Sequence, residues 1–333
     1  MADVNINAGN ISSVNLRQQG SNPTAPANGI KLFEKASGIY FVDSNSVVSG
    51  PLGAMFTPGG RLSMQSGTAV TTTDMHSGTS LWYNPHIHDM LSLWDGSKIV
   101  PVQFAPTAIS LAGLSGTSSF DVFTYLNSGV PAYETSMWTS PTVRAVDISM
   151  QNGRKCKVGD ATRLYLGSFY TSSGGQTDDS VIKRNVWNRY NQKIRPVYKA
   201  DITGSWTYET TSWRNANNSA ANRIEYTCGL IGEGGLVMSA CCAVGIDSGI
   251  SVGVSIAENG TAPHASTDRE YATNYNSAAA VTYSMASAGL CLSGATGFNY
   301  YQWVELGGNS SGTTTFYGEV TGRKANISGY VMG

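Results

Sequence analysis

Charged residues are scarce in this chain. Only 13% of its 333 residues are Asp, Glu, Lys or Arg, and the formal net charge is −1. A chain this close to neutral has no general electrostatic attraction to nucleic acid or to an acidic membrane surface. Histidine is rarer still, with four residues, so few imidazoles are present to activate a nucleophile. The sequence therefore predicts no nucleic-acid partner and gives little support for catalysis.

Paired cysteine motifs are also missing, although the chain has five cysteines. None has Cys-x-x-Cys spacing, and the adjacent Cys241 and Cys242 would point to opposite faces of a strand. We expect free thiols in a protein that is made in a reducing cytoplasm. No signal-peptide pattern follows Met1, and the longest mildly apolar run, 235–246, is too short to cross a bilayer. Membrane insertion is not expected.

Glycine is abundant, with 38 residues, and Ser, Thr and Asn fill many of the intervening stretches. β-Branched and aromatic residues recur between glycine-rich turns, which is typical of an all-β protein. This spacing of strands and long polar loops predicts a jelly-roll-like β-sandwich over 120–333. One short helix is expected to begin at Asp178. Its apolar side would carry Val181, Ile182, Val186 and Tyr190.

The chain divides into four expected segments. Residues 1–27 form an extended arm, rich in Asn, Ser and Gln, with little apolar surface to bury. Residues 28–105 form a β-hairpin stem, 106–119 a linker rich in Gly and Ser, and 120–333 the C-terminal domain. The isolated apolar side chains of the arm suit a groove on a neighbouring protein. The residues expected to dock the chain onto a larger particle are Val4, Ile6, Ile11, Val14 and Leu16.

The stem is predicted from two related hairpins. The first pairs a strand at 30–35 with one at 39–43, and the second lies within 81–101 and turns at Asp95-Gly96. A hairpin of this size is not stable alone in water, so its apolar side chains need a partner. Identical chains intertwined around a shared axis would supply one. The residues expected to pack in this stem are Leu32, Phe33, Tyr40, Phe41, Trp82 and Trp94.

Two regions of the chain carry a family resemblance. The first contains Asn22-Pro23-Thr24-Ala25-Pro26, Lys31-Leu32-Phe33, Gly38-Ile39-Tyr40-Phe41 and Gly50-Pro51-Leu52. This proline-rich arm with an aromatic hairpin resembles the N-terminal region of tailed-bacteriophage fibre and appendage proteins. The second region contains Arg163-Leu164-Tyr165-Leu166-Gly167 and Asn185-Val186-Trp187-Asn188, and is similar to a module of phage virion proteins. The resemblance implies a virion component, assembled in the host cytoplasm, and no reaction.

His86 and His88 are the one histidine pair with metal-ligand spacing. On a strand, residues two apart share a face, so both imidazoles could point at one ion. One chain would offer two nitrogens, and three chains around a threefold axis would offer six, which suits an octahedral site. The phage-fibre resemblance implies an axial metal ion of this kind. The alternative is that two histidines next to Pro85 are ordinary surface residues.

No catalytic constellation is evident in the sequence. There is no Gly-x-Ser-x-Gly elbow, and no pair of carboxylates is placed for glycoside hydrolysis. Asp178 and Asp179 are explained by capping of the predicted helix. We therefore expect a non-enzymatic protein and name no catalytic residue. The alternative is a tail-borne carbohydrate-active enzyme whose site assembles from distant residues.

Aromatic side chains beside Asn and Ser are typical of saccharide sites, where rings stack on sugars. The candidates for glycan binding are Trp206, Tyr208, Trp213 and Tyr271. Trp206 and Tyr208 would share a strand face, so they can equally belong to the core. The basic stretch Arg154-Lys155-x-Lys157 could bind an anionic polysaccharide, or it could be solvated charge that forms ion pairs between chains.

Together with the resemblance, these patterns predict a non-enzymatic structural protein of a tailed-phage particle. We expect a homotrimeric tail or head fibre whose arm docks on tail, portal or capsid proteins. Its C-terminal domain would face outward and contact a host-surface glycan. The alternative is a capsid decoration protein, which would be compact and would cement neighbouring capsomers.

Overall fold

The computed structural model describes residues 19–35, 38–49, 57–247, 250–266, 268–274, 282–308 and 313–333. Over these residues the chain is all-β, as predicted, with strands β1 to β28 and a short 3-10 segment, η1 (Ala216–Asn218). None of the described segments forms a helix with the length and apolarity that a bilayer crossing needs. The predicted docking residues of the arm lie outside the described residues: Val4, Ile6, Ile11, Val14 and Leu16.

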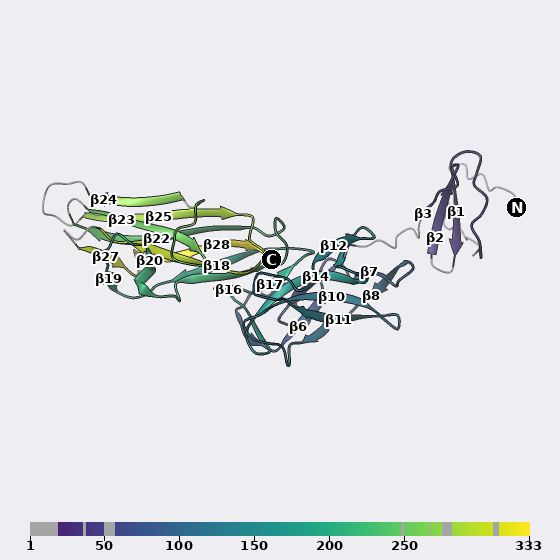
Figure 1. The fold of residues 1–333 in the computed structure, drawn as a ribbon, viewed down its shortest axis with the longest axis horizontal. Helices are drawn as coiled ribbons and strands as arrows, with labels where there is room; N and C mark the ends of the chain where they lie inside the picture. Colours follow the sequence, from purple (N-terminus) through teal and green to yellow (C-terminus); the bar gives the residue numbers. More distant parts are fainter. Residues whose placement is uncertain are drawn as a thin grey trace.

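The first predicted hairpin is confirmed. β1 (Ile30–Lys35), β2 (Gly38–Asp43) and β3 (Val48–Ser49) form a three-stranded antiparallel sheet, called here the hairpin unit. Its register pairs Leu32 with Phe41 and Phe33 with Tyr40. Among the described strands these three pair only with one another, and they lie apart from the other sheets in Figure 1.

Residues 57–190 form a second part, called here the middle module. Its central strands are β10 (Ser119–Asn127) and β14 (Asp160–Ser173), which pair with each other. The same sheet includes β11 (Val130–Met137), β12 (Ile148–Gln151), β13 (Arg154–Lys157) and β17 (Val186–Asn188). One smaller sheet contains β4 (Gly60–Ser63), β6 (Ser80–Pro85) and β9 (Thr107–Ser110). Another pairs β7 (Met90–Trp94) with β8 (Ile99–Gln103).

The expected linker at 106–119 does not separate two cores. Ile109 and Leu111 lie in one hydrophobic cluster with Leu81 of β6 and Phe120 of β10. Each of the two small sheets has an apolar face, and both faces pack against the central sheet of the middle module. The part of the expected stem that follows residue 57 therefore belongs to the middle module, and the hairpin unit is separate from it.

The helix expected from Asp178 is wrong. The chain instead forms β15 (Gln176–Asp179) and β16 (Lys183–Arg184), followed by β17. β15 also pairs with β5 (Met75–Gly78), and β16 runs parallel to β21 (Arg223–Cys228). The buried Asp179 carboxylate forms ion pairs with Arg184 at 3.0 Å and Arg195 at 3.1 Å. These tertiary contacts outweigh the local helical pattern.

Residues 191–333 form a β-sandwich. One sheet contains β18 (Ile194–Ala200), β28 (Ala325–Met332), β22 (Leu236–Ile246) and β25 (Thr282–Leu292), and is extended by β27 (Thr314–Tyr317) and β19 (Ser205–Thr207). The opposing sheet contains β21, β26 (Gly297–Leu306), β23 (Ile250–Glu258) and β20 (Arg214–Asn215). β24 (Asp268–Asn274) pairs with β23 and with β25, so it joins the two sheets.

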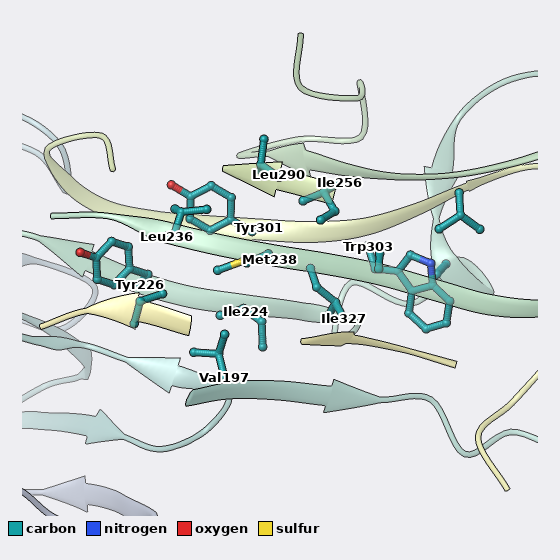
Figure 2. Packing of buried hydrophobic residues seen from close by; sticks show 14 of the residues in the cluster. Val197, Ile224, Tyr226, Leu236, Met238, Ile256, Leu290, Tyr301, Trp303 and Ile327 are labelled. Carbon is teal, nitrogen blue, oxygen red and sulfur yellow. The ribbon is translucent and has the colours of Figure 1, made fainter. Parts of the chain in front are cut away.

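Apolar side chains from both sheets meet inside the sandwich (Figure 2). Val197, Met238 and Ile327 come from the first sheet, and Tyr301 and Trp303 from the opposing one. This cluster continues to the middle module through Phe123, Tyr165 and Trp187. β10 and β14 thus have one hydrophobic cluster on each face. The C-terminal end of β28 lies at this junction, near the middle of the molecule (Figure 1).

Candidate functional site

The sheet of β18, β28, β22 and β25 has one face in the core and one face turned to solvent. Alternation along the strands decides which side chains point outward: on β22, Leu236 and Met238 are buried, whereas Val237 is 57% exposed. We call the solvent side the outer sheet face. Its members are Ile194, Pro196, Tyr198, Ala200, Val237, Ser239, Cys241, Ala243, Met285, Ser287, Gly289, Cys291, Asn326, Ser328, Tyr330 and Met332.

None of these outer-face residues is Asp, Glu, Lys or Arg. Several of the apolar ones are exposed, including Ile194 at 67% and Tyr330 at 57%. The strand register places Pro196, Tyr330, Val237 and Cys291 in one row across the four strands. Exposed apolar side chains scattered singly are normal, but a large contiguous apolar patch is typical of an interaction surface. The outer sheet face, where serines alternate with exposed apolar side chains, is the candidate for such a surface.

The outer sheet face is hollowed between β18, β28 and β22. A hollow of about 450 Å³ is lined by Tyr198, Val237 and Tyr330. Gly329 sets the close approach of two strands there, because a Cβ at this position would lie 2.0 Å from the carbonyl oxygen of Val237. The hollow gives the patch a shape that an apolar side chain of a partner can enter.

The polar groups at the edge of this face are paired within the chain. Tyr198 donates a hydrogen bond to the Glu319 carboxylate, and Asn326 Nδ2 donates to Glu319 Oε2 at 2.7 Å. Lys324 Nζ lies 3.3 Å from Glu319 Oε1. Burial alone would raise the pKa of Glu319, but these hydrogen bonds outweigh it and hold the pKa below its usual value. A partner that covers the face therefore meets no unpaired charge at this edge.

The hairpin unit presents a second face with exposed apolar side chains, which it shares with the charged Glu34 and Asp43. Ile30 is 62% exposed, Leu32 48% and Ile39 42%. The register puts these three side chains on one face of the sheet. On the other face Phe33 is buried and stacks on Tyr40, with ring centroids 5.7 Å apart. The structure thus divides the predicted stem residues of this unit between a covered face and an uncovered one.

The other predicted stem residues lie elsewhere. Trp82 is on β6 and Trp94 ends β7, and both are half-buried in the middle module. Leu81 and Leu93, their neighbours along the chain, are fully buried there. The structure therefore places Trp82 and Trp94 with the strands of the middle module, and Phe33, Tyr40 and Phe41 with the hairpin unit.

The histidine pair lies in the loop between β6 and β7, and not on a strand as the metal prediction assumed. His88 Nδ1 accepts a hydrogen bond from the backbone N–H of Met90 at 3.2 Å. Burial lowers the pKa of His86, and the charges of Lys193 and Arg61 lower it further. Within the described residues, no three His, Cys, Asp or Glu side chains are grouped closely enough to hold a metal ion.

Two of the predicted glycan-binding residues serve the sandwich itself. Trp206 is partly buried, stacks on Phe316 with centroids 5.9 Å apart, and donates its indole N–H to Glu305 at 2.7 Å. Arg214 binds the other oxygen of Glu305 at 2.8 Å and lies 3.7 Å from the ring centroid of Tyr208. Burial raises the pKa of Glu305. This network holds both aromatic side chains in place.

The remaining two candidates are only partly defined. Trp213 is half-buried and directly precedes β20. Tyr271 is on β24, and its side chain lies outside the described part of the chain. The structure therefore brings Trp206 and Tyr208 together around Glu305 and Arg214, and shows no shared site for all four predicted aromatic residues.

A buried serine–aspartate contact joins β10 and β14. Ser168 Oγ donates to Asp121 Oδ1 at 2.6 Å and lies 2.6 Å from the hydroxyl of Tyr165. Arg144 binds the same carboxylate through Nε at 2.8 Å and Nη2 at 3.0 Å. Ser168 and Tyr165 are fully buried, so this group is closed to a substrate. Its geometry is that of an internal ion-pair network.

Comparison with known proteins gives no family. No family model matches the chain, and no curated protein matches it. Among solved structures, it is similar to the insecticidal delta-endotoxin Cry8Ea1 of Bacillus thuringiensis, with 9% identity and a TM-score of 0.23. That match covers 81% of this chain and 52% of the endotoxin chain, so this chain spans about half of it. A structure of the Gx strain of infectious bursal disease virus matches with 10% identity and a TM-score of 0.20, over 78% of this chain and 73% of that one.

Proposed function

We propose that this chain is a non-enzymatic structural protein that works as a homotrimer, as a fibre or appendage of a tailed-phage particle. The observation that carries the proposal is the outer sheet face, an uncharged surface that spans four strands. A second copy of the chain has the same uncharged face, so it is a partner with a matching surface. Copies that cover this face for one another remove Val237 and Tyr330 from water.

The dimensions of the outer sheet face suit a stable interface. β22 and β25 have eleven residues each, β28 has eight and β18 has seven. The mean strand length is therefore about nine residues, or about 31 Å at about 3.4 Å per residue. Four strands at a spacing of about 4.8 Å give a width of about 19 Å. The product is about 600 Å², about three quarters of the roughly 800 Å² per partner of a standard protein interface.

The same width is compatible with a trimer. Three sheets about 19 Å wide, arranged as the sides of a triangular prism, each lie about 5.5 Å from the central axis. Half the usual spacing between packed sheets is about 5 Å. Side chains such as Tyr330 and Val237 would therefore fill the interior of the prism. The exposed Ile30, Leu32 and Ile39 of the hairpin unit would be covered in the same assembly.

The assignment to a phage particle and to a host surface is based on the sequence resemblance alone. The resemblance of residues 22–52 to fibre and appendage proteins supports a virion protein whose N-terminal arm docks on tail, portal or capsid proteins. An outward sandwich would then contact a host-surface glycan. Trp213 remains a candidate aromatic contact, because Trp206 and Tyr208 are held by Glu305, Phe316 and Arg214.

The test is the mass of the purified protein, measured by light scattering coupled to size exclusion, for the wild type and two variants. Val237→Asp places a carboxylate in the centre of the outer sheet face, where an unpaired buried charge prevents association. Val130→Asp is the matched control, because Val130 is 61% exposed on the β11 hairpin. We expect a trimer for the wild type and for V130D, and a monomer for V237D. A wild-type monomer at every concentration, or a V237D trimer, would contradict the proposal.

A further inference from the structure

Arg154 is a buried arginine on the β12–β13 hairpin. It follows the turn at Asn152 and Gly153, and its residue is 8% exposed. One of its nitrogens, Nη1, donates a hydrogen bond to the backbone carbonyl of Ser92 on β7. The other two, Nε and Nη2, are buried and make no hydrogen bond within the described chain. A buried guanidinium with two open donors is unusual, because each donor left unmade costs free energy.

Arg154 also has no carboxylate partner among the described residues. Burial lowers its pKa, and the only groups that act in the opposite direction are Cys156 and Tyr190. The buried Arg144 and Arg184 differ, since each forms an ion pair with a buried aspartate. Buried charges in proteins are normally paired. Arg154 is therefore a buried cation without a counter-ion among the described residues.

A cavity lies beside this side chain. It has a volume of about 180 Å³, and its lining includes Arg154, Lys155, Arg189 and Tyr190. Lys155 is half-buried, and Arg189 lies 2.8 Å from Glu233, which is its partner. Two cations of the lining, Arg154 and Lys155, are thus available to a ligand in this part of the chain. The volume is smaller than the roughly 300 Å³ at which pockets for drug-sized ligands begin.

We propose that this cavity binds an oxyanion, attracted by the charge of Arg154, which has no carboxylate partner among the described residues. A buried guanidinium without a carboxylate partner is stabilised by a nearby anion. Lys155 adds a second charge at the rim. A cavity of this size suits a single anionic sugar residue, so the ligand class is an acidic saccharide or a phosphate-bearing one. The site is built by one chain and does not depend on the proposed trimer.

The experiment is isothermal titration calorimetry at constant ionic strength with three probes: sodium glucuronate, inorganic phosphate and glucose. We expect glucuronate or phosphate to bind the wild type and glucose to give no signal. Arg154→Met removes the charge but keeps most of the side-chain volume, and should weaken binding about tenfold or more. Lys98→Met removes one positive charge from an exposed turn and should leave affinity within about twofold.

The three probes distinguish the possible ligand classes, and the variants show whether Arg154 and Lys155 bind the anion. Preference for glucuronate points to a uronic acid, and preference for phosphate points to a phosphorylated polymer; both support the site. No binding of either anion to the wild type, or equal binding by R154M, overturns it. If circular dichroism shows that R154M is misfolded, Lys155→Met replaces it, with an expected loss of about threefold or more; unchanged affinity of K155M then overturns the proposal. None of these results depends on the oligomeric state.

Discussion

Removing the Asp121 carboxylate should lower the free energy of unfolding, because this group anchors the contact between the middle module and the sandwich. Asp121 is 2% exposed and accepts hydrogen bonds from Arg144 Nε, Arg144 Nη2 and Ser168. The guanidinium of Arg144 also lies 4.2 Å from the ring centroid of Trp138, and it donates to the backbone carbonyl of Gly229, which follows β21. The network thus connects strand β10 of the middle module to the opposing sheet of the sandwich.

The magnitude follows from the charge that is left behind. Asp121→Ala leaves Arg144 buried without its counter-ion, and breaking a buried pair in this way costs about 3–5 kcal/mol. Arg144→Met leaves the carboxylate buried and should cost a similar amount. The double variant removes both charges, so its loss should be far smaller than the sum, with a coupling energy of about 3 kcal/mol.

Urea unfolding of the four proteins, followed by tryptophan fluorescence at one protomer concentration, measures these energies. A loss below about 1 kcal/mol for D121A would refute the reasoning, since an exposed pair would give that value. Additive losses in the double variant would refute it as well, because they would mean that the two charges do not stabilise each other.

Two further predictions concern the sandwich. Burial alone would raise the pKa of Asp201, but hydrogen bonds from Asn222 at 2.6 Å and Thr203 at 2.9 Å hold it below its usual value. The contribution of Asp201 to the free energy of unfolding is therefore complete above about pH 4 and is lost as the pH falls through the lower folded pKa. Asp201→Asn should flatten this acid dependence of stability, measured by urea unfolding at several pH values. An unchanged dependence would contradict the prediction. Gly229→Ala should lower stability by about 1–3 kcal/mol, because a Cβ there would lie 2.2 Å from the Tyr165 hydroxyl and 2.3 Å from the Trp187 ring; an unchanged melting temperature would contradict it.

The fold class could be predicted because β-sheet information is partly local. Glycine-containing turns and runs of β-branched or aromatic residues identify the 30–35 and 39–43 strands without any tertiary contact. The helix prediction failed for the opposite reason. Val181, Ile182 and Val186 are spaced as on a helix, but the conformation depends on the ion pairs of Asp179 with Arg184 and Arg195. Arg195 lies on another strand, which a local pattern does not reveal.

The candidate surfaces depend even more on strand pairing. Alternation on β22 is visible in the sequence, but it does not say which neighbours Val237 has. Only the register places Tyr330 and Cys291 beside it, on strands far away in the sequence. The role of Glu305 was hidden in the same way, because its partners Trp206 and Arg214 come from other strands. The basic stretch at Arg154 could be found from the sequence, but its missing counter-ion could not.

The most direct measurement of self-association through the outer sheet face is the reactivity of its thiols. Cys291 is exposed in the single chain, whereas Cys156, Cys228 and Cys242 are buried. A chromogenic disulfide reagent should therefore react rapidly with Cys291 only where no second copy covers it. We predict slow labelling of Cys291 in the assembled wild type and fast labelling in monomeric V237D. Fast labelling of Cys291 in both proteins would show that the outer sheet face is uncovered and would contradict the proposed assembly.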